Sequence, residues 1–125
     1  ESAGGINVGA ELEGGFSEVS AEQVVAWNPD VIVAVQYCDC TVDDILSNPQ
    51  LQTVKAVRDG RVYMFPSSMD PWDYPEPRSI LGMLWLATKL YPERMADVNL
   101  LEEVDTFHET FFGKSFTELG GTLDD

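Results

Sequence analysis

The sequence predicts an α/β fold: a three-layer αβα lobe with a short and mostly parallel sheet, truncated at its N-terminal end. The first observation behind this prediction is a continuous apolar run, Val31 to Val35, typical of a strand covered on both faces. The second is another strand pattern, Arg61 to Phe65, which begins about 30 residues later, the length of one βαβ unit.

A short helix is expected before the first strand. Ser20 to Gln23 has the form of a capping box, in which side chains bind the free amides of a helix start. Apolar residues continue to Trp27. The helix should end at Asn28, because the residue before Pro29 is pushed out of the α region.

Between the two strands the sequence predicts a helical crossover. Thr41 to Asp44 is a second helix start, and this helix should run to about Leu46, before the break at Asn48-Pro49. A short helical piece is expected from Gln50 to Val54, followed by a turn at Asp59-Gly60.

A hairpin is the local alternative to that crossover. It would pair Val54–Val57 with Val62–Phe65 around the Asp59-Gly60 turn. The crossover is preferred because the spacing of the two strands fits a βαβ unit.

A stiff loop and an apolar helix follow the second strand. Three prolines lie between Asp70 and Arg78, and each fixes one φ angle. The rings of Trp72 and Tyr74 can therefore be held out for recognition with little entropy left to lose. The helix from Arg78 to Leu90 is expected to anchor this loop in a core.

The last predicted helix starts at the capping residue Asn99 and ends before Gly113. His108 is the only histidine, and we interpret it as a packing residue rather than a catalytic base or haem ligand. The apolar face of this helix consists of Leu101, Val104, His108 and Phe111, with Leu100 and Phe107 beside it.

Composition excludes several function classes. The net charge of −15 argues against nucleic acid as a partner and against unaided binding to an anionic membrane. No apolar run approaches the ~20 residues that span a membrane. With 125 residues, 44% of them hydrophobic, residues 1–125 are expected to form a single domain.

Cys38 and Cys40 are the only cysteines. We expect free thiols, because a disulfide between residues two apart closes a strained small ring. Metal ligation by the pair is the alternative, although two sulfurs without a second Cys/His pair are a weak pattern.

Ligands of open α/β sheets bind beyond the carboxyl ends of the strands. Two loops leave such ends, Gln36–Cys40 (the first loop) and Pro66–Glu76 (the second loop). They combine aromatic and polar residues, as small-molecule sites do. The candidate contacts are Tyr37, Ser67, Ser68, Asp70, Trp72, Asp73 and Tyr74. The alternative for Trp72 is that its ring caps the core.

An acidic cluster beside the cysteines supports a second hypothesis. Asp39, Asp43 and Asp44 could hold a divalent cation and, with Cys38, form a metal-dependent hydrolase. The helix dipole alone also explains acidic residues in a first helical turn.

Four segments occur in a familiar order: SAEQVVAWNPDVIVAV, NPQLQTVKAVRDGRVYMFP, WDYPEPRSILGMLWLATKLYPE, and FG after an aromatic helix. From about Ala3 to Gly113 they resemble the C-terminal lobe of substrate-binding proteins of ABC importers for iron–siderophore, haem and cobalamin. The resemblance implies a two-lobed, non-catalytic binding protein that holds a metal chelate between its lobes. It also implies an extracytoplasmic location, in the periplasm or at the cell surface, anchored or secreted.

The resemblance implies ligand contacts from the segments that match Tyr37–Asp39 and Ser67–Trp72. Tyr74 and Arg78, which lie next to the second of these segments, are added as candidates. The candidate ligand-binding residues are therefore Tyr37, Cys38, Asp39, Ser67, Ser68, Met69, Trp72, Tyr74 and Arg78. In the resembling proteins an acidic residue near the start of the helix that matches Pro77–Leu90 docks onto arginines of the permease, and Asp73 and Glu76 are the residues here that could serve in this role. Anionic ferric chelates usually bind to arginines, and Arg78 is the only arginine near the two loops. Neutral and cationic chelates are therefore candidate ligands beside anionic siderophores.

In the resembling proteins a strand and a helix precede the segment that matches Ala3–Val8. Their absence here leads us to interpret the chain as a fragment. Exposed sheet edges would invite pairing with another copy, so a homodimer is a third hypothesis.

Overall fold

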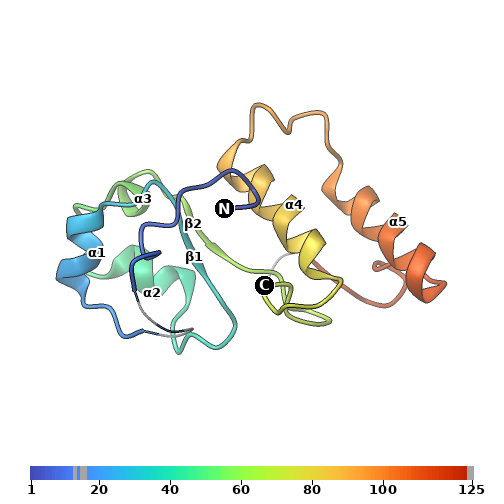
Figure 1. Ribbon diagram of the computed structural model, residues 1–125, viewed down its shortest axis with the longest axis horizontal. Helices are drawn as coiled ribbons and strands as arrows, with labels where there is room; N and C mark the ends of the chain where they lie inside the picture. The colour runs from blue at the N-terminus through green and yellow to red at the C-terminus, as the bar shows by residue number, and fades with distance from the viewer. Residues whose placement is uncertain (13, 15–16, 124–125) are drawn as a thin grey trace. The chain divides into compact units, whose positions relative to one another are not determined.

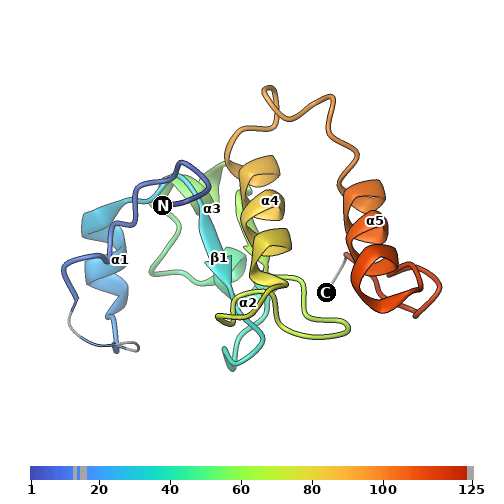
Figure 2. The same ribbon diagram turned by 45° about the vertical axis from the view of Figure 1, so that its right-hand side comes forward.

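The computed structural model describes residues 1–12, 14 and 17–123. The chain is α/β and has two compact units, Ile6–Met64 (the strand unit) and Glu1–Gly5 with Phe65–Asp125 (the helical unit). Figures 1 and 2 show α1, α2 and α3 with the strands of the first unit, and the longer α4 and α5 of the second. No helix in the described part of the chain is long and apolar enough to cross a membrane.

The strand unit contains a two-stranded parallel sheet, β1 (Ile32–Ala34) with β2 (Val62–Met64). Ile32 lies opposite Val62, and Ala34 lies opposite Met64. This pairing confirms both predicted strands and the crossover, and the predicted alternative of a hairpin is wrong. Because the strands are parallel, the chain leaves both of them at the same edge of the sheet.

Local capping begins the first two helices of this unit. In α1 (Ala21–Trp27), the Ser20 hydroxyl accepts a hydrogen bond from the amide of Gln23 at 3.2 Å. The helix ends at Asn28, which adopts the left-handed conformation with φ 45°. In α2 (Val42–Ser47), Thr41 and Asp44 form a complete capping box. Both predicted helix starts are confirmed.

The capping box of α2 predicts an acid-dependent loss of stability. Hydrogen bonds to Asp44 from the hydroxyl of Thr41, and then from its amide, lower the pKa of that carboxyl below the usual 3.8. A lowered pKa stabilises the folded state above pH 3.8, and this contribution is lost as pH falls through the folded-state pKa.

Asp44→Ala should therefore destabilise the protein near neutral pH, and the difference from the parent should shrink on acidification below pH 3.8. Chemical denaturation over a pH series measures this difference. Asp43→Ala is the matched control, because it removes a carboxylate from the same turn without touching the capping box. A difference that is constant with pH would contradict the prediction.

The third helix differs from its prediction. Residues 49–53 form turns, and α3 spans Lys55–Arg58 instead of 50–54. Its start is fixed from elsewhere in the unit, since the Asn28 side chain accepts a hydrogen bond from the amide of Lys55 at 2.8 Å. Val54, just before the helix, is completely buried. Tertiary contacts therefore override the local pattern here.

The core of the strand unit lies around α3. Its core cluster consists of the buried residues Leu51, Val54, Ala56, Val57 and Val62, with Ala21, Val24, Ile32, Val42, Ile45 and Leu46 packed against them. These side chains come from all five elements of the unit, so the short sheet is held by its helices as well as by its own hydrogen bonds.

The helical unit is built on α4 (Ser79–Leu90) and α5 (Leu100–Phe112), which contact each other. Both helices match the predicted ranges closely, and Gly113 ends α5 with φ 76° as expected. Trp85 of α4 is buried and its ring lies 4.8 Å from that of Phe65.

The buried face of α5 is narrower than predicted. Val104 and His108 are buried, whereas Leu101 and Phe111 are 41% and 67% exposed. The His108 ring nitrogen Nδ1 lies 2.9 Å from the carbonyl oxygen of Val104, and its ring is 5.0 Å from that of Phe116. His108 is therefore a packing residue, as its position on the helix predicts.

Candidate ligand-binding loops

The first and second loops begin at the same edge of the β1–β2 pair. The first loop follows Ala34 by one residue, and the second follows Met64 by one residue. Ala34 and Met64 are register partners, so the two loops have neighbouring starting points. This edge is where ligands of open α/β sheets bind.

In the first loop the structure corrects the prediction for the cysteines. Cys38 and Cys40 form a disulfide, not two free thiols. A turn, in which the amide of Cys38 donates to the carbonyl of Val35 at 2.9 Å, precedes them. Their Cα atoms are 5.1 Å apart, inside the range of about 4.4–6.8 Å that disulfides accept. Tyr37 is 61% exposed beside this bridge.

In the second loop the predicted presentation of Trp72 is wrong. Its side chain is only 2% exposed and packs against Phe116, with ring centroids 5.9 Å apart. The alternative, in which Trp72 caps the core, describes its position. Tyr74, two residues later, is 47% exposed. The ring that this loop leaves accessible is therefore Tyr74.

Arg78 is engaged by acidic side chains of its own chain. It forms ion pairs with Asp70 and with Glu76, the latter at 3.2 Å between Nε and Oε1. Its guanidinium also lies 5.8 Å from the centre of the Phe112 ring. These contacts neutralise the cation that sequence reasoning assigned to a ligand. They also occupy Glu76, while Asp73 is exposed.

The hydroxyl of Ser68 is also engaged within the chain. It donates to the carbonyl oxygen of Thr122 at 2.8 Å and accepts from the amide of Thr122 at 2.9 Å. Ser67 and Met69, on either side, are half-buried. Sequence reasoning missed Thr122 and Phe116, since neither belongs to a motif and both meet the loop across a long sequence separation.

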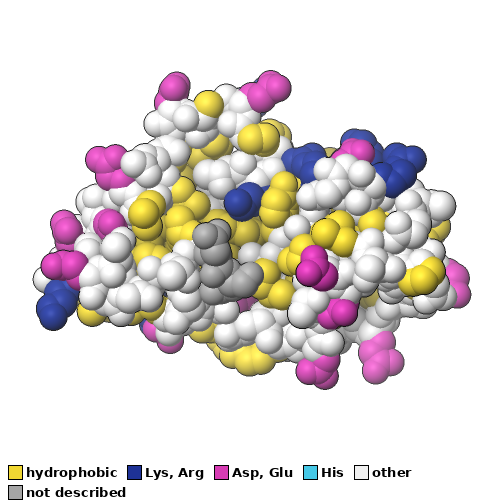
Figure 3. Space-filling model, turned by 180° about the vertical axis from the view of Figure 1, so that it is seen from behind, with side chains coloured by type: hydrophobic (Ala, Val, Ile, Leu, Met, Phe, Trp, Pro, Cys, Tyr) yellow, Lys and Arg dark blue, Asp and Glu magenta, His cyan; other side chains and the backbone are white. Residues whose placement is uncertain are grey.

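The acidic cluster offers no metal site. Asp44 is the capping residue of α2, which accounts for its position. In the ranges that the structure describes, no group of three His, Cys, Asp or Glu side chains could hold a metal ion. Asp39, Asp43 and Asp44, the carboxylates named in the hydrolase hypothesis, therefore form no such group. Acidic side chains are scattered over the face of the molecule shown in Figure 3.

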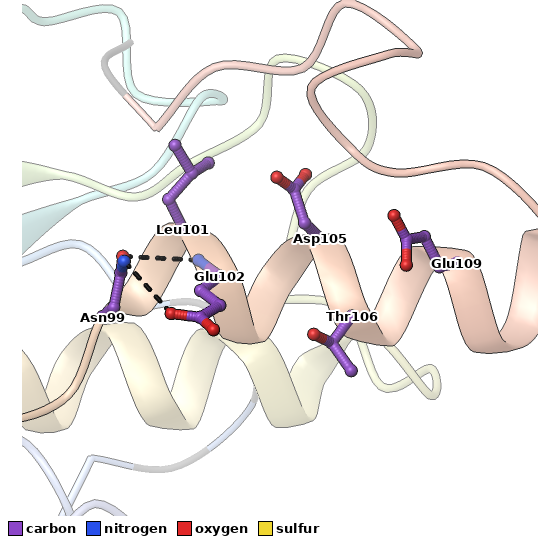
Figure 4. Close-up of a pocket in the computed structure, with 6 residues that line it drawn as sticks. All are labelled: Asn99, Leu101, Glu102, Asp105, Thr106 and Glu109. Atoms are coloured by element: carbon purple, nitrogen blue, oxygen red, sulfur yellow. Dashed lines mark hydrogen bonds between the residues drawn. The ribbon is translucent and has the colours of Figure 1, made fainter.

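A surface hollow of 410 Å³ lies along α5 and contains none of the predicted site residues (Figure 4). Two of its acidic groups have structural roles: Glu102 bonds to the capping residue Asn99, and Asp105 accepts from Thr117. Its lining residues are Asn99, Leu101, Glu102, Asp105, Thr106 and Glu109. The hollow is formed by one helix and does not involve the loops.

Comparisons with known proteins find relatives in sequence and in fold. The molybdate-binding protein MolA of Haemophilus influenzae is 37% identical over 117 residues, which are 93% of this chain and 33% of MolA. A periplasmic solute binding protein from Veillonella parvula superposes with a TM-score of 0.82 at 28% identity, over 97% of this chain and 39% of that one. Helicobacter pylori CeuE, solved as a nickel–histidine complex, superposes with a TM-score of 0.71 at 29% identity, over 83% and 33%.

The chain thus spans a third of the length of MolA. Residues 1–69 match the sequence model of a family described as periplasmic binding protein. That match covers more than half of the chain and includes β1, the first loop and β2. The chain therefore belongs to the periplasmic binding protein family.

Proposed function

We propose that the protein carrying this chain is an extracytoplasmic solute-binding protein of an ABC importer, and that residues 1–125 belong to its C-terminal lobe. Its role is to bind a solute and to deliver it to the permease, without catalysis. The observation that supports this most is the common origin of the two loops at the carboxyl edge of a parallel strand pair, in a member of this family.

The ligand class that we propose is a transition metal held in a small neutral or cationic complex. The exposed ring of Tyr37 and the exposed carboxylate of Asp39, both on the first loop, are the contacts that we propose for it. The pairing of Arg78 with Asp70 and Glu76 supports this class, because it leaves the loop without a free positive charge for an anion. Ferric siderophores, haem and cobalamin fall in this group when their complexes carry no net negative charge.

Molybdate is the second candidate, because the 37% identical relative is a molybdate-binding protein. An oxyanion would need hydrogen-bond donors such as backbone amides and the hydroxyls of Ser67 and Tyr37. It would also need Arg78 to leave at least one of its acidic partners.

For the permease we propose docking through Asp73. This carboxylate is exposed on the proline-rich loop, so it can form a directional pair with an arginine. Glu76 would serve only after exchanging Arg78 for an arginine of the partner.

Isothermal titration calorimetry on the full-length protein tests the ligand proposal. Probes should include nickel–histidine, a ferric siderophore, haem, cobalamin and molybdate. We expect micromolar or tighter binding of one metal complex and a tenfold or greater loss in Tyr37→Ala, about 1.4 kcal/mol.

Phe111→Ala is the control for that titration, since it removes a similarly exposed ring from α5. If Tyr37→Ala leaves the affinity within threefold of the parent, the first loop is not the binding loop. If none of the probes binds, the proposed ligand classes are wrong.

A further inference from the structure

The end of α5 is followed by a compact turn, Ser115–Thr122, which we call the C-terminal segment. Ser115 and Glu118 bind each other reciprocally: the Glu118 carboxylate accepts from the amide of Ser115 at 3.1 Å, and the Ser115 hydroxyl accepts from the amide of Glu118 at 3.1 Å. The amides of Leu119 and Gly121 donate to carbonyls within the segment, at 3.1 and 2.9 Å. The segment is thus built by its own hydrogen bonds.

The C-terminal segment is also tied to α5. Asp105 accepts hydrogen bonds from the amide and the hydroxyl of Thr117, at 2.9 and 3.0 Å. Phe116 is 1% exposed and its ring lies 5.0 Å from that of His108. Because two contacts with α5 hold this segment in place, it can fix the position of a loop that packs against it.

The second loop packs against this segment at two places. The ring of Trp72 packs against Phe116, and the hydroxyl of Ser68 exchanges two hydrogen bonds with the backbone of Thr122. Trp72 is buried, and the hydroxyl of Ser68, although that residue is exposed, already donates one hydrogen bond and accepts another. The exposed ring of Tyr74 lies two residues beyond the first of these contacts.

We propose that the C-terminal segment positions the second loop for ligand binding, with Ser68 and Trp72 as positioning residues rather than ligand contacts. The ligand part of this inference rests on the proposed function. Holding a loop in its binding conformation raises affinity because less conformational entropy is lost when the ligand binds. The positioning part depends only on the contacts between the segment and the loop.

A double-mutant cycle separates positioning from direct contact. Its arms are Ser68→Ala and deletion of residues 119–123, which removes Thr122 and keeps Phe116. Two readouts are needed in the full-length protein: hydrogen exchange of the amides in residues 67–76, and the dissociation constants for nickel–histidine and molybdate. Thr110→Ala is the matched control, because it removes a hydroxyl that bonds to a backbone carbonyl of α5 away from the loop.

We expect Ser68→Ala and the deletion each to accelerate exchange of the loop amides and to weaken binding by about three- to tenfold, the size of one lost hydrogen bond. Combined, the two changes should weaken binding no more than the deletion alone. Thr110→Ala should alter neither readout.

Unchanged loop exchange in Ser68→Ala would overturn the inference, and this variant is mild enough to stay folded. A further loss of affinity when Ser68→Ala is added to the deletion would also overturn it, because Ser68 would then contact the ligand itself. If the parent protein binds neither probe, the proposed ligands are wrong, whereas the exchange measurement still decides whether the segment positions the loop.

Discussion

Replacing Trp72 with alanine should lower the free energy of unfolding by about 3–5 kcal/mol, the usual cost of removing a large buried ring. Trp72 is 2% exposed and lies between Phe116 and the start of α4. Urea denaturation followed by circular dichroism measures the change without depending on the fluorescence of the removed residue.

Tyr74→Ala is the matched control for Trp72→Ala. Both rings belong to the second loop, but Tyr74 is 47% exposed, so its removal should cost less than about 1 kcal/mol. The pair also separates two interpretations of the loop. If Trp72→Ala leaves stability unchanged and abolishes ligand binding, the ring is presented to the ligand as the prolines predict, and its buried position is not the functional one.

Gly82→Ala should also destabilise the helical unit. A Cβ at this position of α4 would lie 2.7 Å from the carbonyl oxygen of Trp72 and 2.8 Å from the Phe65 ring. Alanine gains about 0.5–1 kcal/mol in a helix interior, but overpacking against backbone costs about 1–3 kcal/mol. The net result should be a loss, because the carbonyl of the loop cannot move without shifting Trp72.

Thermal unfolding of Gly82→Ala beside Met83→Ala checks this expectation. Met83 is the next residue of α4 and is 40% exposed, so its replacement should change the melting temperature little. An unchanged or raised melting temperature for Gly82→Ala would mean that the second loop does not pack on α4 as closely as the structure has it.

The parts of the fold that depend on neighbouring residues could be predicted from the sequence. Ser20 and Thr41 fix two helix starts because their hydroxyls bind amides three positions away. Val31 to Val35 predicts a strand because its β-branched residues suit a sheet covered on both faces, and the structure places β1 there. Such signals lie within a few residues and need no knowledge of the rest of the chain.

The parts of the fold that depend on distant residues could not be predicted from the sequence. The start of α3 is set by Asn28, which is 27 positions from Lys55. The position of Trp72 is set by Phe116, and that of Ser68 by Thr122, 54 positions away. The prolines predict a stiff loop, but stiffness does not say whether a ring turns outward or inward. A single distant aromatic partner decides that for Trp72.

The state of Cys38 and Cys40 and the partners of Arg78 could not be predicted from the sequence either. Spacing alone argued against a bridge between Cys38 and Cys40, yet the turn after Val35 brings them within disulfide range. Charge counting assigned Arg78 to a ligand, whereas Asp70 and Glu76 flank it closely enough to take both sides of its guanidinium. In both cases the deciding factor is backbone geometry that composition does not encode.

The discontinuous make-up of the helical unit has a consequence for the order in which the protein folds. Residues 1–5 belong to that unit although residues 6–64 form the other one, and Gly4 accepts a hydrogen bond from the hydroxyl of Tyr91, 87 positions later. During synthesis the chain emerges from its N-terminus, so the segment 6–64 is complete before Tyr91 exists. Residues 1–5 can therefore dock on Tyr91 only after α4 has left the ribosome, and this docking closes one of the longest loops in the chain.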